Sequence, residues 1–265
     1  MTTRQPEISL DALRQEIDAI DGDLLRLLIR RFETTDRVGA NKAFDGSLGV
    51  SPLRPAREAT MLRRLISESR GSLSPDLIVQ LWRVILSASI QSQAPVTLHM
   101  AKTDEHDMVA RTIVAQHFFG ISVLFHDGAN EVIQHIRQKR GDLAVLAAGS
   151  GWGDDIFSGD PIPTQIVATL PALASGAEPQ LFVLGHVDPQ PSGDDETLLL
   201  LPPNVPMPSS RLWHMAVGRF VLVSLPGFLA VEVDPLREYL RHRPGVLVAG
   251  RCPRPIRYEH ANFSE

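Results

Sequence analysis

Hydrophobic side chains recur every three or four positions along the first part of the chain. This spacing is typical of one face of an amphipathic helix, and the positions are Leu10, Leu13, Ile17, Ile20, Leu24, Leu27 and Leu28. Ser9 is a suitable N-cap and no proline follows before Pro52, so the pattern predicts one helix from about residue 10 to about residue 44. At 1.5 Å per residue this helix is roughly 50 Å long, far beyond the usual three or four turns.

Two shorter helices are expected after a glycine-containing loop at 45–49. One covers about 55–70, and the other begins at Ser74-Pro75, where serine caps the helix and proline takes its first position, and runs to about 94. Three helices with one very long member cannot close a core alone. The pattern therefore favours pairing with a second copy of the chain.

The second part of the chain alternates between strand-like and helix-like segments. The pattern predicts strands at 96–100, 121–125 and 143–147, with helices at about 104–119 and 131–140 between them. This β-α-β-α-β order is typical of a parallel sheet. Beyond Gly149 the expected strands are 180–184, 197–201, 219–224, 228–233 and a last one at 246–249, with a helix at 235–241.

Proline content and charge divide the chain just before Pro95. Residues 1–94 hold 4 of the 20 prolines and are close to neutral, with 13 Lys/Arg against 12 Asp/Glu. Because proline breaks helix interiors, long helices are expected only in this part. We therefore predict a multidomain protein in which an all-α three-helix domain at 1–94 is followed by an α/β domain at 95–265.

Composition narrows the class of protein. The chain is 43% hydrophobic and 22% charged, as in ordinary water-soluble domains, and no apolar run reaches the ~18 residues that a membrane span needs. The net charge of -5 disfavours a general nucleic-acid binder. No secretory signal is visible, and the single cysteine, Cys252, excludes an internal disulfide framework. The expectation is a cytoplasmic protein without nucleic-acid or membrane partners.

Two cations on the first helix can face one small anion. Arg31 and Lys42 are eleven residues apart, which leaves them within about 20° of each other around the helix and ~16 Å apart along it. Arg31 also follows Leu24 by seven residues and so lies on the apolar face, where a cation needs a partner or a ligand anion. Arg30-Arg31 flanking the apolar stripe is the simpler interpretation and stays open.

Arg14 favours a site that two chains complete together. It lies ~25 Å from Arg31 along the same helix and roughly 100° around it, so the two cannot hold one small metabolite within a single straight helix. In an antiparallel pair, Arg14 of one copy can lie opposite Arg31 of the other. Ser89 and Gln93 share a face of the third helix, while Arg57 and Glu58 open the second.

Residues 9–94 resemble the all-helical, AroQ-class chorismate mutases. The resemblance is carried by an ordered set of segments: Leu-Asp-Ala-Leu-Arg at 10–14, Ile-Asp-Ala-Ile-Asp at 17–21, Leu-Leu-Arg-Leu-Leu-Ile-Arg-Arg at 24–31, Val-Gly-Ala-Asn-Lys at 38–42, Arg-Pro-Ala-Arg-Glu at 54–58 and Ser-Ile-Gln-Ser-Gln at 89–93. The resemblance implies an intertwined homodimer that converts chorismate to prephenate by a Claisen rearrangement, in the biosynthesis of phenylalanine and tyrosine.

The same resemblance implies a role for each candidate residue. Arg14 from the partner copy and Arg31 bind the two substrate carboxylates, with Ser89 assisting. Lys42 and Gln93 donate to the ether oxygen whose bond breaks. Arg57 lies at the rim and Glu58 holds the ring hydroxyl, whereas Arg54 stands where some members have an acid. A pericyclic step needs no nucleophile, metal or cofactor, so cations and neutral donors suffice.

The remaining two-thirds of the chain carry weaker signals. The region 95–265 faintly resembles a degenerate prephenate dehydratase domain, with Ala101-Lys102-Thr103 and Pro179-Gln180-Leu181-Phe182 in place of that family's characteristic segments, and it is expected to serve regulation or assembly. His117, His126 and His135 appear dispersed without metal-ligand spacing, and Cys252 is expected to be inert.

Two other functions remain open from the sequence. Isochorismate-pyruvate lyases are similar in their helical fold but usually lack the acid that Glu58 supplies. A non-catalytic sensor would use residues 95–265 to bind a small aromatic effector.

Overall fold

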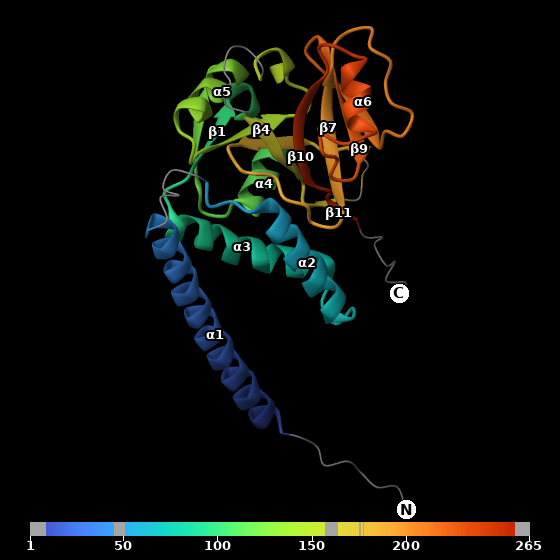
Figure 1. Cartoon of the computed structure of the whole chain (residues 1–265). Coiled ribbons are helices and arrows are strands. Elements are labelled where there is room, and N and C mark those ends of the chain that lie inside the picture. The colour runs from blue at the N-terminus through green and yellow to red at the C-terminus, as the bar shows by residue number, and fades with distance from the viewer. Residues whose placement is uncertain (1–8, 45–50, 157–163, 175, 177, 258–265) are drawn as a thin grey trace, which may run out of the picture. The chain divides into compact units, whose positions relative to one another are not determined.

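The three helices predicted for the first part of the chain are confirmed, with nearly the predicted ends. The computed structural model (Figure 1) places α1 at Leu10–Phe44, α2 at Pro55–Ser69 and α3 at Pro75–Gln93. Ser9 Oγ accepts a hydrogen bond from the Ala12 amide and Ser74 Oγ accepts one from Leu77, both at 3.2 Å. Both predicted serine caps therefore satisfy an amide of the first helical turn.

The structure describes residues 9–44, 51–156, 164–174, 176 and 178–257, with the backbone alone for 41–44. The predicted loop at 45–49 lies outside the described residues. The chain forms two compact units, Met1–Ser47 and Leu48–Glu265. Helix α1 belongs to the first unit, whereas α2 and α3 belong to the second, together with the α/β region.

A mixed sheet of nine strands organises the described part of the second unit. Its order is β2-β1-β3-β6-β4-β10-β7-β9-β8, with the strands at Thr97–Ala101 (β1), Ser122–His126 (β2), Leu143–Ala147 (β3), Gln165–Leu170 (β4), Leu181–Gly185 (β6), Asp195–Leu201 (β7), Trp213–Val217 (β8), Phe220–Pro226 (β9) and Leu247–Pro253 (β10). Strands β1, β2 and β3 are parallel. The predicted β-α-β-α-β unit is thus confirmed at this edge, and antiparallel strands make up much of the rest.

Helices cover both faces of the sheet. Helix α4, at Met108–His117, lies on one face and α5, at Ala129–Gln138, on the other, because their apolar residues join different core clusters. Along β6 the side chains alternate, with Val183 in the α4 cluster and Phe182 in the α5 cluster. Helix α6, at Leu236–Arg241, covers a third cluster built on β7 and β9.

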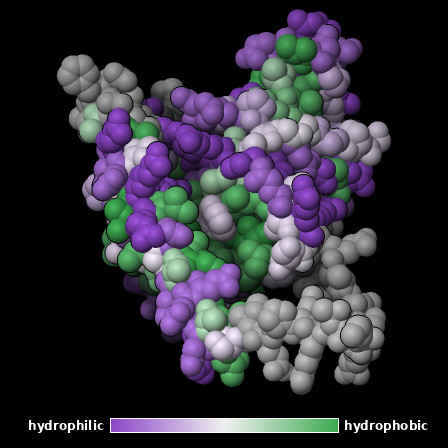
Figure 2. All heavy atoms as spheres, turned by 90° about the horizontal axis from the view of Figure 1, so that it is seen from below, coloured by the Kyte–Doolittle hydropathy of each residue, from purple (hydrophilic) through white to green (hydrophobic). Residues whose placement is uncertain are grey.

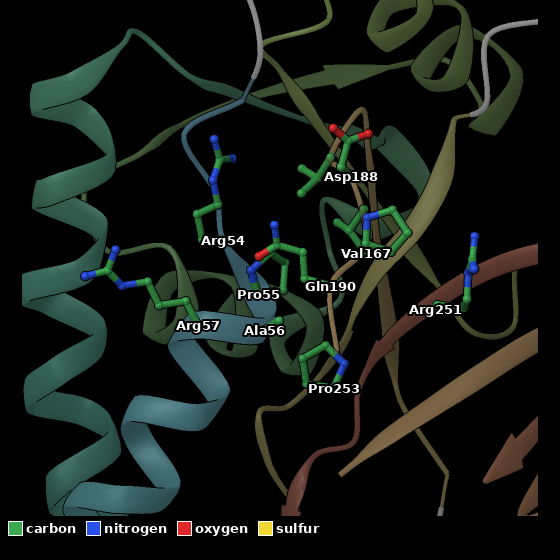
Figure 3. A pocket seen from close by; sticks show the side chains of 11 residues that line it. Arg54, Pro55, Ala56, Arg57, Val167, Asp188, Gln190, Arg251 and Pro253 are labelled. Carbon is green, nitrogen blue, oxygen red and sulfur yellow. The ribbon is translucent and has the colours of Figure 1, made fainter. Parts of the chain in front are cut away.

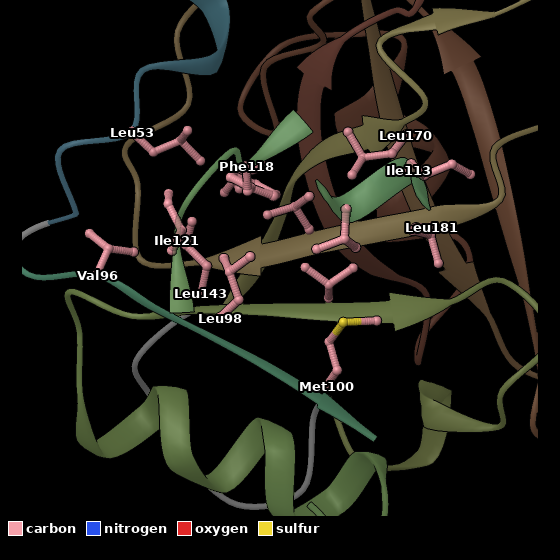
Figure 4. Packing of buried hydrophobic residues seen from close by; sticks show 14 of the residues in the cluster. Leu53, Val96, Leu98, Met100, Ile113, Phe118, Ile121, Leu143, Leu170 and Leu181 are labelled. Atoms are coloured by element: carbon pink, nitrogen blue, oxygen red, sulfur yellow. The ribbon is translucent and has the colours of Figure 1, made fainter. Parts of the chain in front are cut away.

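Helices α2 and α3 pack against the sheet as well as against each other. Leu53, just before α2, and Ile90 of α3 are buried in the same cluster as Leu98, Phe118 and Leu143 (Figure 4). The segments predicted to form the helical domain therefore share a core with the α/β region. The domain boundary expected before Pro95 stays a prediction. The compact units of the structure are divided elsewhere, between Ser47 and Leu48.

Several expected elements of the second part are wrong in detail. The helix expected at 104–119 starts at Met108, because Asp107 caps it through the amides of Val109 and Ala110 and Lys102–Asp104 forms a 3-10 turn. Residues 228–233 form no strand: Gly227, at φ +93°, ends β9 in a turn.

The sequence pattern also missed elements. The pattern does not predict four strands: β4, β8, the short β5 at Leu173–Ala174, and β11 at Ile256–Arg257. Strand β11 follows the strand that was expected to be the last, and it pairs with β5. Gly250 of β10 is required by close packing, because a Cβ there would overlap the carbonyl oxygen of Ile166 on β4.

Candidate active site

Three of the predicted site residues lie on α1. Arg14 is exposed and pairs with Asp11 at 3.2 Å. Arg31 is half-buried, with its guanidinium carbon 5.9 Å from the centre of the Phe32 ring. Lys42 lies near the C-terminal end of the same helix, and its side chain is outside the described residues. One continuous helix therefore carries all three, as the spacing predicted.

The surface of α1 is apolar on much of its circumference. Leu10, Ile17 and Leu24 are 71%, 57% and 53% exposed, and Leu13, Ile20, Leu25, Leu27 and Ile29 are exposed as well. Figure 2 shows one face of the molecule, on which hydrophobic and hydrophilic residues are interspersed. A row of large apolar side chains of this length is normally covered by another protein surface.

The other predicted residues lie on α2 and α3. Ser89 is buried and donates to the carbonyl oxygen of Ile85 at 2.7 Å. Gln93, one turn later, donates to the carbonyl oxygen of Ser89 at 2.9 Å. The structure thus brings Ser89 and Gln93 together on one helix face, as predicted, near the end of α3.

Arg57 is exposed at the first turn of α2 and lines a pocket against the α/β region. Figure 3 shows the side chains of Arg54, Arg57 and Arg251 spread around this pocket, with Arg57 pointing away from Gln190. The Nη1 atom of Arg54 donates to the carbonyl oxygens of Ser51 and Leu53, both at 2.8 Å. Arg54 therefore closes the turn that leads into α2, and the three guanidinium groups do not converge on one point.

Glu58 has a different environment from the one the sequence suggests. Its carboxylate accepts a hydrogen bond from Arg83 Nη1 of α3 at 2.7 Å, and both side chains are 8% exposed. Its other oxygen receives the backbone amide of Arg54 at 3.4 Å, as a helix-capping contact. In the single chain, Glu58 is thus held by Arg83 and by the start of its own helix.

Arg83 is a further residue of the candidate site, and the sequence analysis does not predict it. Its Nη1 also lies 3.2 Å from Nε2 of His117, at the end of α4. Burial lowers the pKa of His117 well below its usual range, and the neighbouring Arg83 charge lowers it further. The imidazole is therefore neutral near pH 7, with Nε2 free of a proton to accept from the guanidinium. One feature of the sequence could have identified Arg83: it lies one helical turn from Val79 and one turn from Ser87, and so on the same buried face of α3.

Part of the Arg83 guanidinium lacks a protein partner. Its Nε atom is buried without a hydrogen bond, and Nη2 has none within the described residues. An unsatisfied buried donor costs about 1–3 kcal/mol. Arg83 and His117 line two adjoining hollows, one shared with Glu58 and Arg254 and the other with Gln80 and Gln116.

The histidines expected to be dispersed are partly clustered. The rings of His126 and His135 have centroids 4.2 Å apart, and the ring of His99, which has no distinctive spacing in the sequence, lies 5.3 Å from that of His135. Nδ1 of His99 lies 2.7 Å from Nε2 of His126, and its Nε2 lies 3.2 Å from Asp142. Parallel pairing of β1 with β2 brings His99 near His126, and α5 adds His135. The described residues hold no group of three or more His, Cys, Asp or Glu suited to a metal ion.

Cys252 and Glu196 lie in the core of the sheet. Burial raises the pKa of Glu196, although its carboxyl group accepts hydrogen bonds from Ser224, Trp213 and Thr169 at 2.6, 3.0 and 3.1 Å. Burial also raises the pKa of the Cys252 thiol well above its usual range, and Glu196 adds to the shift. A protonated, buried thiol is a poor nucleophile, which supports the expectation that Cys252 is inert.

Comparison with known proteins finds that the helical segment is similar to one family. Residues 13–94 match the family described as chorismate mutase type II. Over 85 residues the chain is 33% identical to a bifunctional chorismate mutase/prephenate dehydratase of Neisseria gonorrhoeae, covering 32% of this chain and 22% of that protein. Over 86 residues it is 40% identical to a T-protein of Enterobacter agglomerans, again covering 32% and 22%.

The matched segment ends where the α/β region begins. The chain spans about a quarter or less of the length of these two relatives. Among solved structures, prephenate dehydratase from Streptococcus mutans aligns with 60% of this chain and 97% of its own, at 12% identity and a TM-score of 0.38. In the described residues, no helix is long and apolar enough to cross a membrane.

Proposed function

We propose that the chain is a chorismate mutase that acts as a homodimer, with Arg14 donated across the interface. The observation that carries the proposal is the match of residues 13–94 to chorismate mutase type II, because this segment contains all the predicted site residues. The exposed apolar side chains of α1 support the dimer, since a second copy of the same helix would cover them.

The proposed chemistry requires positioning and charge stabilisation. Arg14 and Arg31 would hold the two carboxylates of chorismate in the compact conformer, which supplies the orientation that a pericyclic reaction needs. Lys42 and Gln93 would donate to the ether oxygen, where negative charge grows as its bond breaks. Ser89 and Arg57 would assist in binding, and the product is prephenate.

Glu58 is the residue whose proposed role needs the largest change. To hold the ring hydroxyl, its carboxylate has to share or release the bond to Arg83 that it makes in the single chain. A Glu58→Gln variant keeps the side-chain shape and removes the charge. If Glu58 binds the substrate, this variant raises KM or lowers kcat; unchanged kinetics would remove Glu58 from the site and leave the other residues in place.

Incubating the purified chain with chorismate tests the activity directly. Formation of prephenate is expected, and Lys42→Ala or Gln93→Ala is expected to lower kcat by about a hundredfold or more, as for other donors to a developing oxyanion. Lys139→Ala, at the end of α5, serves as the control. A second incubation supplies isochorismate. If this releases pyruvate while chorismate gives no prephenate, the chain is a lyase instead. If the chain binds either compound without converting it, the chain is a sensor.

Mixing two inactive variants tests the shared site. Arg14→Ala and Arg31→Ala chains, refolded together, form heterodimers in which one site keeps both arginines. Activity is expected to return in the mixture and to be absent from each parent. A mixture no more active than its parents would show that Arg14 and Arg31 do not act across the interface.

A further inference from the structure

We propose that the hollow beside Arg83, between α3, α4 and the segment that follows β4, binds a small organic monocarboxylate with an apolar body. The hollow is open to solvent, and the space within it, counted out through its mouth, is about 480 Å³. It is lined by Asp76, Val79, Gln80, Arg83, Ile113, Gln116, His117, Pro171, Ala172 and Leu173. All of these residues lie in the second compact unit.

Arg83 supplies the group that recognises a carboxylate. It is 7% exposed, and its Nη1 is fixed by Glu58 and by neutral His117. These contacts leave Nε and Nη2 without a hydrogen-bond partner in the described residues. Nε is buried, whereas Nη2 is not, so Nη2 is the atom that can donate a charge-assisted hydrogen bond to a carboxylate in the hollow. Glu58 and His117 already hold the plane of the guanidinium in place.

The rest of the lining sets the ligand's shape and polarity. Val79, Ile113 and Leu173 provide apolar walls, which suit a ring or a branched hydrocarbon. The amides of Gln80 and Gln116 can donate further hydrogen bonds to a carboxylate. A phosphate is disfavoured, because a second negative charge would meet Asp76 and Glu58 near a single arginine.

The same contact links the hollow to the proposed catalytic site. A carboxylate on Nη2 shares the positive charge of Arg83 with Glu58, which is bound to Nη1, and so weakens the attraction that holds Glu58. This consequence rests on the proposed mutase function; binding at the hollow does not. A ligand of this class would therefore alter mutase kinetics through Glu58 without touching the other proposed substrate contacts.

Calorimetric titration of the full chain with benzoate tests the site, with benzamide as the uncharged probe of the same shape. Benzoate is expected to bind one per chain and at least about tenfold more tightly than benzamide, since hydrogen bonds between charged groups exceed neutral ones by that much. Gln80→Trp, an exposed position at the rim, is expected to fill the hollow and abolish binding. Gln134→Trp, exposed on α5, is the matched control and is expected to bind as the wild type does.

Three results would overturn the proposal: no saturable benzoate binding below about 10 mM, equal affinity for benzamide, or unchanged binding to Gln80→Trp. Because calorimetry needs no turnover, a chain that binds benzoate but makes no prephenate contradicts only the mutase proposal. A chain that makes prephenate and does not bind benzoate contradicts only the carboxylate site. Adding benzoate to an active mutase then measures the coupling through Glu58.

Discussion

A single buried ion pair joins the two helices that follow α1. Glu58 and Arg83 are separated by 25 residues and meet at 2.7 Å, with 8% of each side chain exposed. Taking two charges out of water is costly, so such a pair adds little net stability compared with apolar residues of the same size. Removing one partner is different, because it leaves the other charge buried and unpaired.

We therefore expect Arg83→Leu to lower the free energy of unfolding by about 3–5 kcal/mol. The double variant Glu58→Leu/Arg83→Leu is expected to lose less than the sum of the two single variants, because no unpaired charge remains. Urea unfolding of the four chains measures both quantities. The exposed pair Arg64–Glu68 is the control, where Arg64→Leu should cost under about 1 kcal/mol; additive losses at Glu58 and Arg83 would contradict the pairing.

His117 makes stability depend on pH. Burial lowers its pKa in the folded chain, whereas an unfolded histidine titrates near 6.5. Between these two pKa values the unfolded chain binds a proton that the folded chain does not, so stability falls as the pH drops below about 6.5. The loss is complete once the pH is below the folded pKa.

His117→Gln is expected to flatten this dependence, because glutamine keeps an acceptor for Arg83 and does not titrate. Unfolding free energies measured from about pH 7.5 to pH 5 should fall less steeply than in the wild type. Some slope remains, because burial also lowers the pKa of His126 and of His186. His214→Gln, at an exposed position on β8, is the control; parallel curves for His117→Gln and the wild type would count against this role.

At the level of elements, the spacing of apolar residues predicts the helices of the first part of the chain, but it does not predict the whole sheet. The apolar spacing in α1 and the Ser74-Pro75 start of α3 are local signals, and both helices form where these signals place them. The sequence pattern does not predict β4, although Ile166 and Val167 are residue types that strands favour. Local patterns carry no information on which strand pairs with which, so the antiparallel half of the sheet was not predictable.

The candidate site shows the same limit. The individual residues were recognisable by spacing and family resemblance, but the contact of Glu58 with Arg83 and His117 depends on packing between α2, α3 and α4. Arg83 and His117 are 34 positions apart in the sequence, and nothing in the residues between them indicates that His117 would contact Arg83. The histidine cluster of β1, β2 and α5 could not be predicted for the same reason.

Helix α1 is predicted to dimerise through its apolar face. Charging that face in Ile17→Asp/Leu24→Asp chains should convert the dimer to a monomer and reduce helix content, because an isolated amphipathic helix is only marginally stable in water. Sedimentation equilibrium and circular dichroism measure the two effects. Gln15→Asp, about 160° around the helix from Ile17, is the matched control, and a wild-type chain that sediments as a monomer at every concentration would contradict the prediction.

On the scale of the whole molecule, the boundary of sequence similarity and the boundary of packing differ. The match to chorismate mutase type II ends at residue 94, yet the compact unit begins at Leu48 and takes in α2 and α3. Leu53 and Ile90, at 2% and 5% exposure, fill the cluster over Leu98 and Phe118. The end of the matched segment and the α/β region thus share one hydrophobic core, which is a direct physical route for one to influence the other.

This arrangement predicts how fragments of the chain behave. Residues 48–265 should fold alone and unfold cooperatively in urea. Residues 95–265 keep α4 but lack Leu53 and Ile90, which cover part of the same face of the sheet. Burial of a leucine or isoleucine side chain stabilises a fold by about 1.5–3 kcal/mol, and the fragment 95–265 loses this contribution at Leu53 and at Ile90. The apolar surface that these two side chains cover then becomes exposed and favours aggregation. Urea midpoints and light scattering of the two fragments make the comparison. Equal midpoints with no aggregation would mean that α2 and α3 rest on the sheet without stabilising it, and the coupling between the helices and the α/β region would then lose its basis.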